Sequence, residues 1–172
     1  MTPQLSMKLD VTKLCRPDQI LFLKNRLDCQ LTQQPRLQEL SDRLIEAGGG
    51  LLVSQNEEDL DNILNRTVIF NHFKKPPLRM IGRPSECHFN ASRCWEANPK
   101  ISRIATGYGL SEDGLWRQHT WVVKQVRHGG RKTFDSTNPG HWQVYETTLP
   151  RLCYFGFILT LDECAKFAFD NL

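Results

Sequence analysis

Two residues in the C-terminal half of the chain have the types and spacing of a thiol-based catalytic site. Cys87 lies in the segment Glu-Cys-His-Phe-Asn, which predicts a turn leading into a helix. A thiol in the first turn of a helix is close to unpaired backbone N–H groups and to the positive end of the helix dipole, which favour the thiolate. The same N–H groups could stabilise an oxyanion beside the sulfur. Cys87 is therefore the candidate nucleophile, although an arbitrary cysteine is more often a small buried packing residue.

The candidate base follows on a predicted strand. His119 lies in Trp-Arg-Gln-His-Thr-Trp, where strand geometry puts His119 and Trp121 on one face. A histidine among apolar neighbours is usually a hydrogen-bonded core residue, so it needs a cysteine in front of it and a carboxylate behind it to act as a base. Gln118, Asn90 and Ser85 are close in sequence to this pair and are the candidates for a second oxyanion donor.

Other side chains near these motifs could contact a substrate. Trp121, Trp116 and Tyr108 could line a cleft, although aromatic residues on strands are more often core residues. Arg117 and Arg131 could bind an anionic substrate, although isolated surface arginines are the commoner outcome. We take Trp121 as the aromatic candidate for substrate contact.

Two acidic residues compete for the third position of a triad. Asp135 and Glu146 both occur in an acid-x-Thr context. If a tight turn folds the His119 strand back, Asp135 lies about four or five residues from the histidine, roughly 13–17 Å away. If instead 127–141 form a long excursion and 142–148 pair with the His119 strand, a register with Glu146 opposite His119 puts their Cβ atoms about 5 Å apart on one face. The geometry favours Glu146 and keeps Asp135 as the alternative.

These motifs together resemble those of the papain-like and transglutaminase-like cysteine enzymes. More narrowly, Glu-Cys-His-x-Asn, Gly-Leu-Trp-Arg-Gln-His-x-Trp and Glu-Thr-Thr are similar to motifs of a family of small, uncharacterised bacterial proteins, over about residues 81–160. In that family the Glu-Thr-Thr strand closely follows the His strand, which implies that 127–141 are an insertion. The resemblance implies Cys87 as nucleophile, His119 as general base and then acid, and Glu146 as the residue that orients the imidazole.

The remaining elements predict an α+β protein. Pro17 and Pro35 each suit the first turn of a helix, glycines at 48–50 end the second helix, and Asn56 is the expected N-cap of a third. A helix is expected at 161–169 after a set of antiparallel strands rich in β-branched and aromatic residues. These predicted strands cover 102–111, 115–126, 142–148 and 152–159.

The order of the elements matches the architecture that the resemblance implies: N-terminal helices, a nucleophile-bearing helix and then an antiparallel sheet. Lys-Lys-Pro-Pro at 74–77 marks a change in composition, and we interpret it as an ordered connection, because the preceding residues carry too few large apolar groups to fold alone. The prediction is a single domain, 1–172, with a helical N-terminal portion at 1–75 and a Cys-His-Glu catalytic core at 76–172.

Composition excludes several classes of protein. The 172 residues include 22 Lys and Arg against 19 Asp and Glu, and the net charge of +3 is too small to indicate nucleic acid as a partner. No apolar run approaches the ~18 residues that span a bilayer, so no membrane is expected. The first residues lack a signal-peptide pattern, which predicts a cytoplasmic protein and leaves open its delivery to another cell as an effector.

No metal or cofactor is expected. The six cysteines include no CxxC pair and predict free thiols. A cluster of Cys87, His88, Cys94 and His119 is the one metal hypothesis, and its spacing matches no familiar zinc pattern. The His-x-Glu and Pro-Cys-x-x-Cys pattern of zinc deaminases is also absent.

The sequence therefore favours a cysteine-dependent amide hydrolase or acyl transferase that acts through a thioester intermediate. The resemblance implies a peptidase, amidase, deamidase or transglutaminase-like enzyme, with an amide- or acyl-bearing substrate that includes proteins and peptides. The alternative is a catalytically inactive papain-like interaction module, whose partner would bind the helical N-terminal portion. The sequence fixes neither the substrate nor the oligomeric state.

Overall fold

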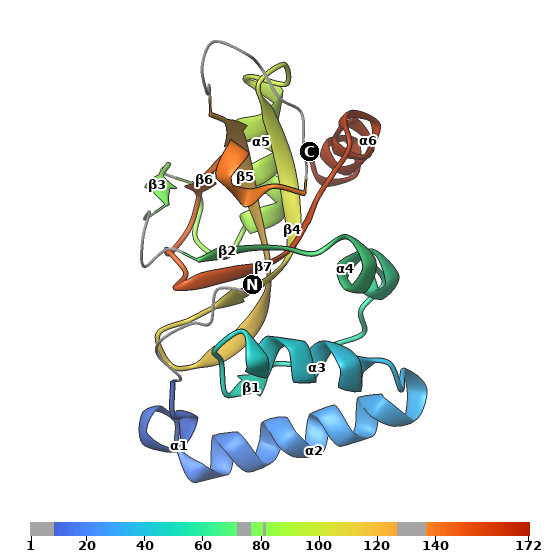
Figure 1. Cartoon of the computed structure of the whole chain (residues 1–172), viewed down its shortest axis with the longest axis vertical. Helices are drawn as coiled ribbons and strands as arrows, with labels where there is room; N and C mark the ends of the chain where they lie inside the picture. The colour runs from blue at the N-terminus through green and yellow to red at the C-terminus, as the bar shows by residue number, and fades with distance from the viewer. Residues whose placement is uncertain (1–8, 72–76, 81, 127–136) are drawn as a thin grey trace.

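The computed structural model describes residues 9–71, 77–80, 82–126 and 137–172 of the chain (Figure 1). The helices of the described residues are α1 (Val11–Leu14), α2 (Pro17–Gln33), α3 (Leu37–Glu46), α4 (Leu60–Arg66), α5 (Cys87–Glu96) and α6 (Leu161–Asn171), with a 3-10 turn η1 (Pro139–His141). The strands are β1 (Leu51–Leu52), β2 (Val68–Asn71), β3 (Leu78–Arg79), β4 (Ser102–Leu110), β5 (Leu115–Gln125), β6 (Trp142–Glu146) and β7 (Cys153–Ile158). The protein is thus an α+β protein, and within these ranges none of its helices has the length and apolar composition required to cross a bilayer.

One curled sheet organises the described residues (Figure 1). Six of its strands follow the order β2-β7-β4-β5-β6-β3, and β1 pairs with β5 outside this path. The central strands β7, β4, β5 and β6 pair antiparallel, as the sequence predicts, and each contains β-branched or aromatic residues, which favour strands. The short strands β1 and β3 pair parallel with β5 and β6, so the sheet is mixed rather than wholly antiparallel. Two-residue strands are too short to give an alternating pattern in the sequence.

The N-terminal part contributes strands as well as helices. Besides β1, it supplies β2, in which Val68 lies opposite Gly156 of β7. The helical portion expected at 1–75 therefore also contains strands, and the β-branched run Thr-Val-Ile at 67–69 was the missed signal for β2. The helices of this part pack on the sheet: Leu40 and Leu44 of α3 are completely buried in the same cluster as Trp116 of β5.

The third helix begins later than predicted. α4 starts at Leu60, with Asp59 in the cap position, and the expected N-cap Asn56 lies outside the helix. The cause is Glu57, which the Asn56 prediction would put in the first helical turn. Its side chain is only 2% exposed and accepts a hydrogen bond of 2.6 Å from the hydroxyl of Tyr108 on β4. This tertiary contact holds the segment before α4 in a non-helical conformation.

The edge of β5 opposite β4 is shared by two short partners. β1 pairs with Leu115 and Trp116, whereas β6 pairs with β5 from Val122 onward. Between these stretches, residues 117–121 of β5 have no strand partner on that edge among the described residues. His119, the candidate base, lies in this stretch of β5.

Candidate active site

Cys87 is the first residue of α5, and the loop before it is held by a side-chain clamp. Asn90 accepts a hydrogen bond of 2.9 Å from the backbone N–H of Arg83 and donates one of 2.7 Å to its carbonyl oxygen. Gly82 packs closely here, because a Cβ at this position would lie 2.6 Å from both the Asn90 amide and the carbonyl oxygen of Thr147. Asn90, expected as an oxyanion or substrate residue, therefore fixes the loop that carries the nucleophile.

His119 and Glu146 form a buried pair at the gap in β5. The Nε2 atom of His119 lies 2.8 Å from Oε2 of Glu146, and the two residues are 2% and 0% exposed. His119 pairs across the sheet with Gly107, whose φ of 154° and contact with the β7 backbone exclude a side chain: a Cβ would lie 2.4 Å from the carbonyl oxygen of Phe155. The structure therefore brings the two residues of the predicted pair together.

The register of β6 differs from the predicted one by two residues. Val122 pairs with Tyr145, so the same register continued by one residue sets Glu146 level with Trp121 rather than with His119. A shift of two residues preserves the face on which a side chain lies. Glu146 therefore reaches His119 diagonally, so the expected contact between the two side chains is present although the predicted register is not.

Glu146 is held as a carboxylate by four hydrogen bonds. Its Oε1 atom accepts from the backbone N–H and the hydroxyl of Thr148 at 2.9 and 3.0 Å, and Oε2 accepts from His119 and from the hydroxyl of Tyr154. Burial opposes ionisation, but the hydrogen bonds from His119, Tyr154 and Thr148 outweigh it and lower the pKa of Glu146 to about 2. A permanent negative charge therefore lies behind the imidazole.

The thiol and the imidazole shift each other toward their charged forms. Burial opposes ionisation of Cys87, but hydrogen bonding to the His119 ring and to the backbone N–H of Thr120 lowers the pKa of the thiol below its ordinary value. Burial likewise favours a neutral His119, yet its hydrogen bonds to Cys87 and Glu146 raise the pKa of the imidazole. The N–H of Thr120 belongs to the stretch of β5 that lacks a strand partner. The arrangement favours a thiolate next to an imidazolium.

The aromatic residues near the site form its support. Trp121 is completely buried and stacks on His119, with ring centroids 6.2 Å apart and an interplanar angle of 16°. Trp121 was expected to contact substrate, but burial beneath His119 prevents this. Tyr108 and Trp116 are also completely buried, which leaves both in the core.

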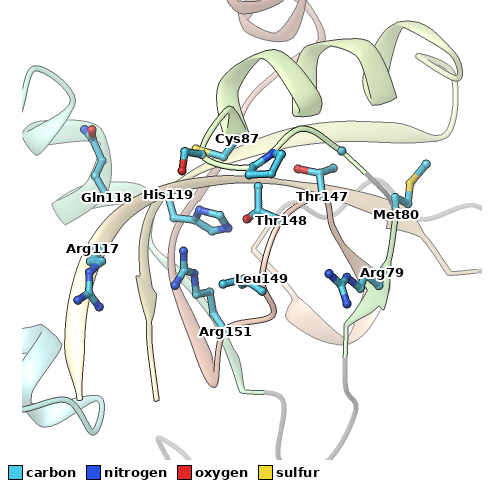
Figure 2. Close-up of a pocket in the computed structure, with 13 residues that line it drawn as sticks. Arg79, Met80, Cys87, Arg117, Gln118, His119, Thr147, Thr148, Leu149 and Arg151 are labelled. Carbon is cyan, nitrogen blue, oxygen red and sulfur yellow. The ribbon is translucent and has the colours of Figure 1, made fainter. Parts of the chain in front are cut away.

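A pocket of about 430 Å³ opens in front of the thiol and the imidazole (Figure 2). This volume lies within the range of small-molecule sites. Cys87, His119, Gln118 and the exposed Ser85 line it. The Thr147–Leu149 segment after β6 forms another part of its wall. Of the expected oxyanion or substrate residues, Ser85 and Gln118 therefore border the pocket.

Gln118 is fixed by a second buried carboxylate that the sequence analysis missed. Its Nε2 donates a hydrogen bond of 3.1 Å to Oε2 of Glu57, and its Oε1 accepts one from Gln55. Glu57 also accepts from Tyr108 and from the backbone N–H of Asp59 at 3.1 Å. The amide of Gln118 is thereby oriented, and among the described residues its second Nε2 hydrogen has no acceptor. Only the tertiary structure reveals this role, because in the sequence Glu57 belongs to an ordinary acidic helix start.

The sequence named three other candidates: Asp135, Arg131 and His88. Asp135 and Arg131 lie outside the described residues. His88 faces away from the pocket: its ring stacks on Phe167 of α6, with centroids 5.4 Å apart, and its Nδ1 is 3.4 Å from the hydroxyl of Thr120. Burial, followed by the charge of His119, lowers the pKa of His88.

The described residues contain no group of three or more His, Cys, Asp or Glu side chains that could hold a metal ion. Comparisons of the chain with protein-family models, with curated proteins and with solved structures gave no match.

Proposed function

We propose that the protein is a cysteine-dependent amide hydrolase or acyl transferase with Cys87, His119 and Glu146 as its triad. The observation that carries the proposal is the ordered series of contacts from the thiol at the start of α5 through the His119 ring to the Glu146 carboxylate, on the wall of a pocket. A merely structural histidine would need neither the thiol nor the pocket. The same arrangement of helix, strand and strand is the basis for a papain-like or transglutaminase-like fold as part of the proposal.

Acylation begins with attack of the Cys87 thiolate on the substrate carbonyl carbon. The sulfur–carbon bond forms as the carbonyl π electrons move to oxygen, which gives a tetrahedral oxyanion. The backbone N–H of Cys87 at the helix start and the free Nε2 hydrogen of Gln118 are the proposed donors to this oxygen. The carbon–nitrogen bond then breaks, the imidazolium of His119 gives its proton to the leaving amine, and a thioester remains.

The second half of the reaction releases the acyl group. His119, now neutral, accepts a proton from water or from an acceptor amine as that nucleophile attacks the thioester carbon. Collapse of the second tetrahedral intermediate expels the Cys87 thiolate, and His119 is again an imidazolium. Water yields a carboxylic acid and an amine yields a new amide, so hydrolysis and transfer differ only in the nucleophile. Glu146 stays ionised throughout and stabilises the imidazolium.

The decisive test is the pH dependence of iodoacetamide alkylation at each cysteine, read by mass spectrometry. Because His119 lowers the pKa of Cys87, we expect alkylation of Cys87 to rise with pH through a midpoint below the ordinary thiol range. Replacing the base (His119→Ala) removes that interaction, so the midpoint should move upward and the rate near pH 6 should fall by more than about tenfold. Cys29, which is exposed and free, is the internal control.

The outcome separates two functions. Fast alkylation of Cys87 alone, lost in His119→Ala, supports the enzyme and justifies a screen of amide substrates. A Cys87 that reacts no faster than Cys29 in the wild-type protein contradicts it and favours an inactive interaction module. For acyl transfer the pH profile should be bell-shaped. The thiolate is lost as pH falls through the lowered pKa of Cys87, and the imidazolium is lost as pH rises through the raised pKa of His119.

A further inference from the structure

The pocket in front of Cys87 has three arginines among its described lining residues. Arg79 from β3, Arg117 from β5 and Arg151 from the segment before β7 border it from different directions (Figure 2). None of its described lining residues is Asp or Glu. The carboxylate of Glu146 lies behind His119 and is not part of the lining. Any substrate that enters the pocket therefore meets a positive wall.

The charges of these arginines are balanced to different degrees. Arg117 makes two hydrogen bonds to the carboxylate of Asp113, at 2.9 and 2.6 Å, which compensates its charge. Arg151 donates 2.7 Å to the neutral hydroxyl of Ser111, and its Nε is buried without a hydrogen-bond partner. No ion pair among the described residues includes Arg79 or Arg151. Among the described residues, these two guanidinium groups at the pocket therefore have no ion-pair partner.

A second depression continues the pocket along α5 with the same character. It shares part of its wall with the first through Met80 and Thr147, and Arg83 and Arg93 add two more guanidinium groups. Arg83 lies over the ring of Phe89, 4.8 Å from its centroid, and is 3.4 Å from the carboxylate of the exposed Glu86. The described lining of this depression also contains no Asp or Glu. The two depressions therefore adjoin each other, and we refer to them together as the groove.

We propose that the substrate is an acidic polypeptide segment, with a carboxylate close to the reacting amide bound by Arg79 and Arg151. A guanidinium can bind a carboxylate through two parallel hydrogen bonds, so two uncompensated arginines select an anionic group by both charge and shape. The groove along α5 accommodates the chain on one side of that amide, and its arginines repel basic segments. This inference rests on the proposed function and names the substrate class of the same site.

The test compares two alkylating agents that differ mainly in charge. Iodoacetamide is neutral and iodoacetate is anionic; in both reactions the Cys87 thiolate displaces iodide and a sulfur–carbon bond forms. We expect the iodoacetate-to-iodoacetamide rate ratio at Cys87 to exceed that at Cys29 by about fivefold or more at low salt. Each of Arg79→Gln and Arg151→Gln should reduce this excess several-fold, and so should added salt. The ratio cancels changes in thiolate content that a variant causes.

The matched control is Arg26→Gln, which removes one exposed positive charge from α2 outside the groove and should leave the ratio unchanged. If iodoacetamide reacts fast at Cys87 but the ratio equals that at Cys29, the acidic substrate is wrong while the enzyme proposal stands. A ratio that falls equally in Arg26→Gln also overturns the assignment, because it reports net charge alone. Slow iodoacetamide alkylation of Cys87 overturns both proposals together.

A competition experiment separates two sources of the carboxylate. Three short acetylated peptides serve as protecting ligands against iodoacetamide: one with an Asp side chain and an amidated C-terminus, one uncharged except for a free C-terminus, and one with no charge. Stronger protection by the Asp peptide than by the neutral one supports an internal acidic segment. Stronger protection by the free C-terminus alone assigns the site to chain ends and corrects the proposal. Equal protection by all three peptides contradicts the proposal, and so does the absence of protection by any of them.

Discussion

Two buried carboxylates at the site, Glu146 and Glu57, have similar surroundings but bind different kinds of side chain. Glu146 is completely buried, accepts a hydrogen bond from the hydroxyl of Tyr154 and holds His119. Glu57 is 2% exposed, accepts a hydrogen bond from Tyr108 and holds Gln118, the next residue along β5. Each carboxylate also accepts from a backbone N–H two residues further along the chain.

The difference between the two lies in whether the partner can carry a proton. His119 can become an imidazolium, so the charge of Glu146 raises its pKa and the pair changes state during the proposed reaction. An amide does not titrate near neutral pH, so Glu57 can only fix the orientation of Gln118. In the proposed mechanism, a buried acid that accepts a hydrogen bond from a tyrosine therefore supports proton transfer at His119 and positions the amide at Gln118.

The largest expected effect comes from neutralising the acid behind the base. Glu146→Gln should lower acylation by p-nitrophenyl acetate, followed as release of nitrophenolate, by about 100-fold, because an amide cannot stabilise the imidazolium. Alkylation of Cys87 near neutral pH should also fall, since the thiolate–imidazolium pair weakens. Glu46→Gln, an exposed substitution on α3, is the control for the loss of one carboxylate.

Asp135→Asn tests the choice between the two acids, because Asp135 is the alternative third member of the triad from the sequence. It should leave acylation much closer to the wild-type rate than Glu146→Gln does. An inactive Asp135→Asn beside an active Glu146→Gln would show that the triad is assigned to the wrong acid.

A smaller effect of a different kind is expected on the other side. Glu57→Gln and Gln118→Ala should each lower acylation by about tenfold through loss of an oriented oxyanion donor. Neither should change alkylation by iodoacetamide, which forms no oxyanion. The double variant should lose little more than Gln118→Ala alone, since Glu57 acts through Gln118.

Two results would contradict the proposed roles of Glu57 and Gln118. Fully additive losses in the double variant would mean that Glu57 does not act through Gln118. A parallel fall in alkylation would assign Gln118 to the thiolate instead of the oxyanion. Unfolding in urea checks that each variant remains folded.

The smallest expected effects come from replacing the two tyrosines and are measured as changes in the free energy of unfolding. Tyr154→Phe should lower the free energy of unfolding at pH 7 by about 1–3 kcal/mol, because it removes a donor to a buried carboxylate. The lowered pKa of Glu146 contributes stability that is full above its ordinary value of 4.5 and lost as pH falls toward about 2. The deficit of Tyr154→Phe should therefore shrink over that range. Urea unfolding at several pH values measures it, with Tyr108→Phe as the matched substitution; a deficit that stays constant down to about pH 2 would contradict the role of Tyr154.

Local sequence was enough for the elements that carry long, regular patterns. The four central strands agree with the predicted ranges to within a few residues, and α5 begins at Cys87, where a helix start was predicted, because alternation and helix-start signals reside in the segments themselves. β1 and β3 were missed because two residues define no period. β2 was missed although its β-branched run was visible. The start of α4 was misplaced because the contact between Glu57 and Tyr108 overrides a favourable capping residue.

For the candidate site, residue types and the alternation of side chains along strands allowed residues to be chosen, whereas the distances between side chains could not be predicted. Cys87, His119 and Glu146 could be chosen because a helix start, an alternating strand and an acid-x-Thr strand each restrict where a side chain faces. The expected roles of Trp121 and Asn90 were replaced by support of His119 and of the loop before Cys87, because packing decides which polar or aromatic groups reach a pocket.

An α+β chain with a thiol at a helix start and a histidine and an acid on neighbouring strands follows from local periodicity and from the alternation of side chains along strands. Only the tertiary structure decided the two-residue register shift, the gap in the pairing of β5 and the groove lined by arginines. It also recruited Glu57 to Gln118. These features arise where segments distant in the chain compete for the same backbone edge and the same buried volume, and no local pattern records the result of that competition.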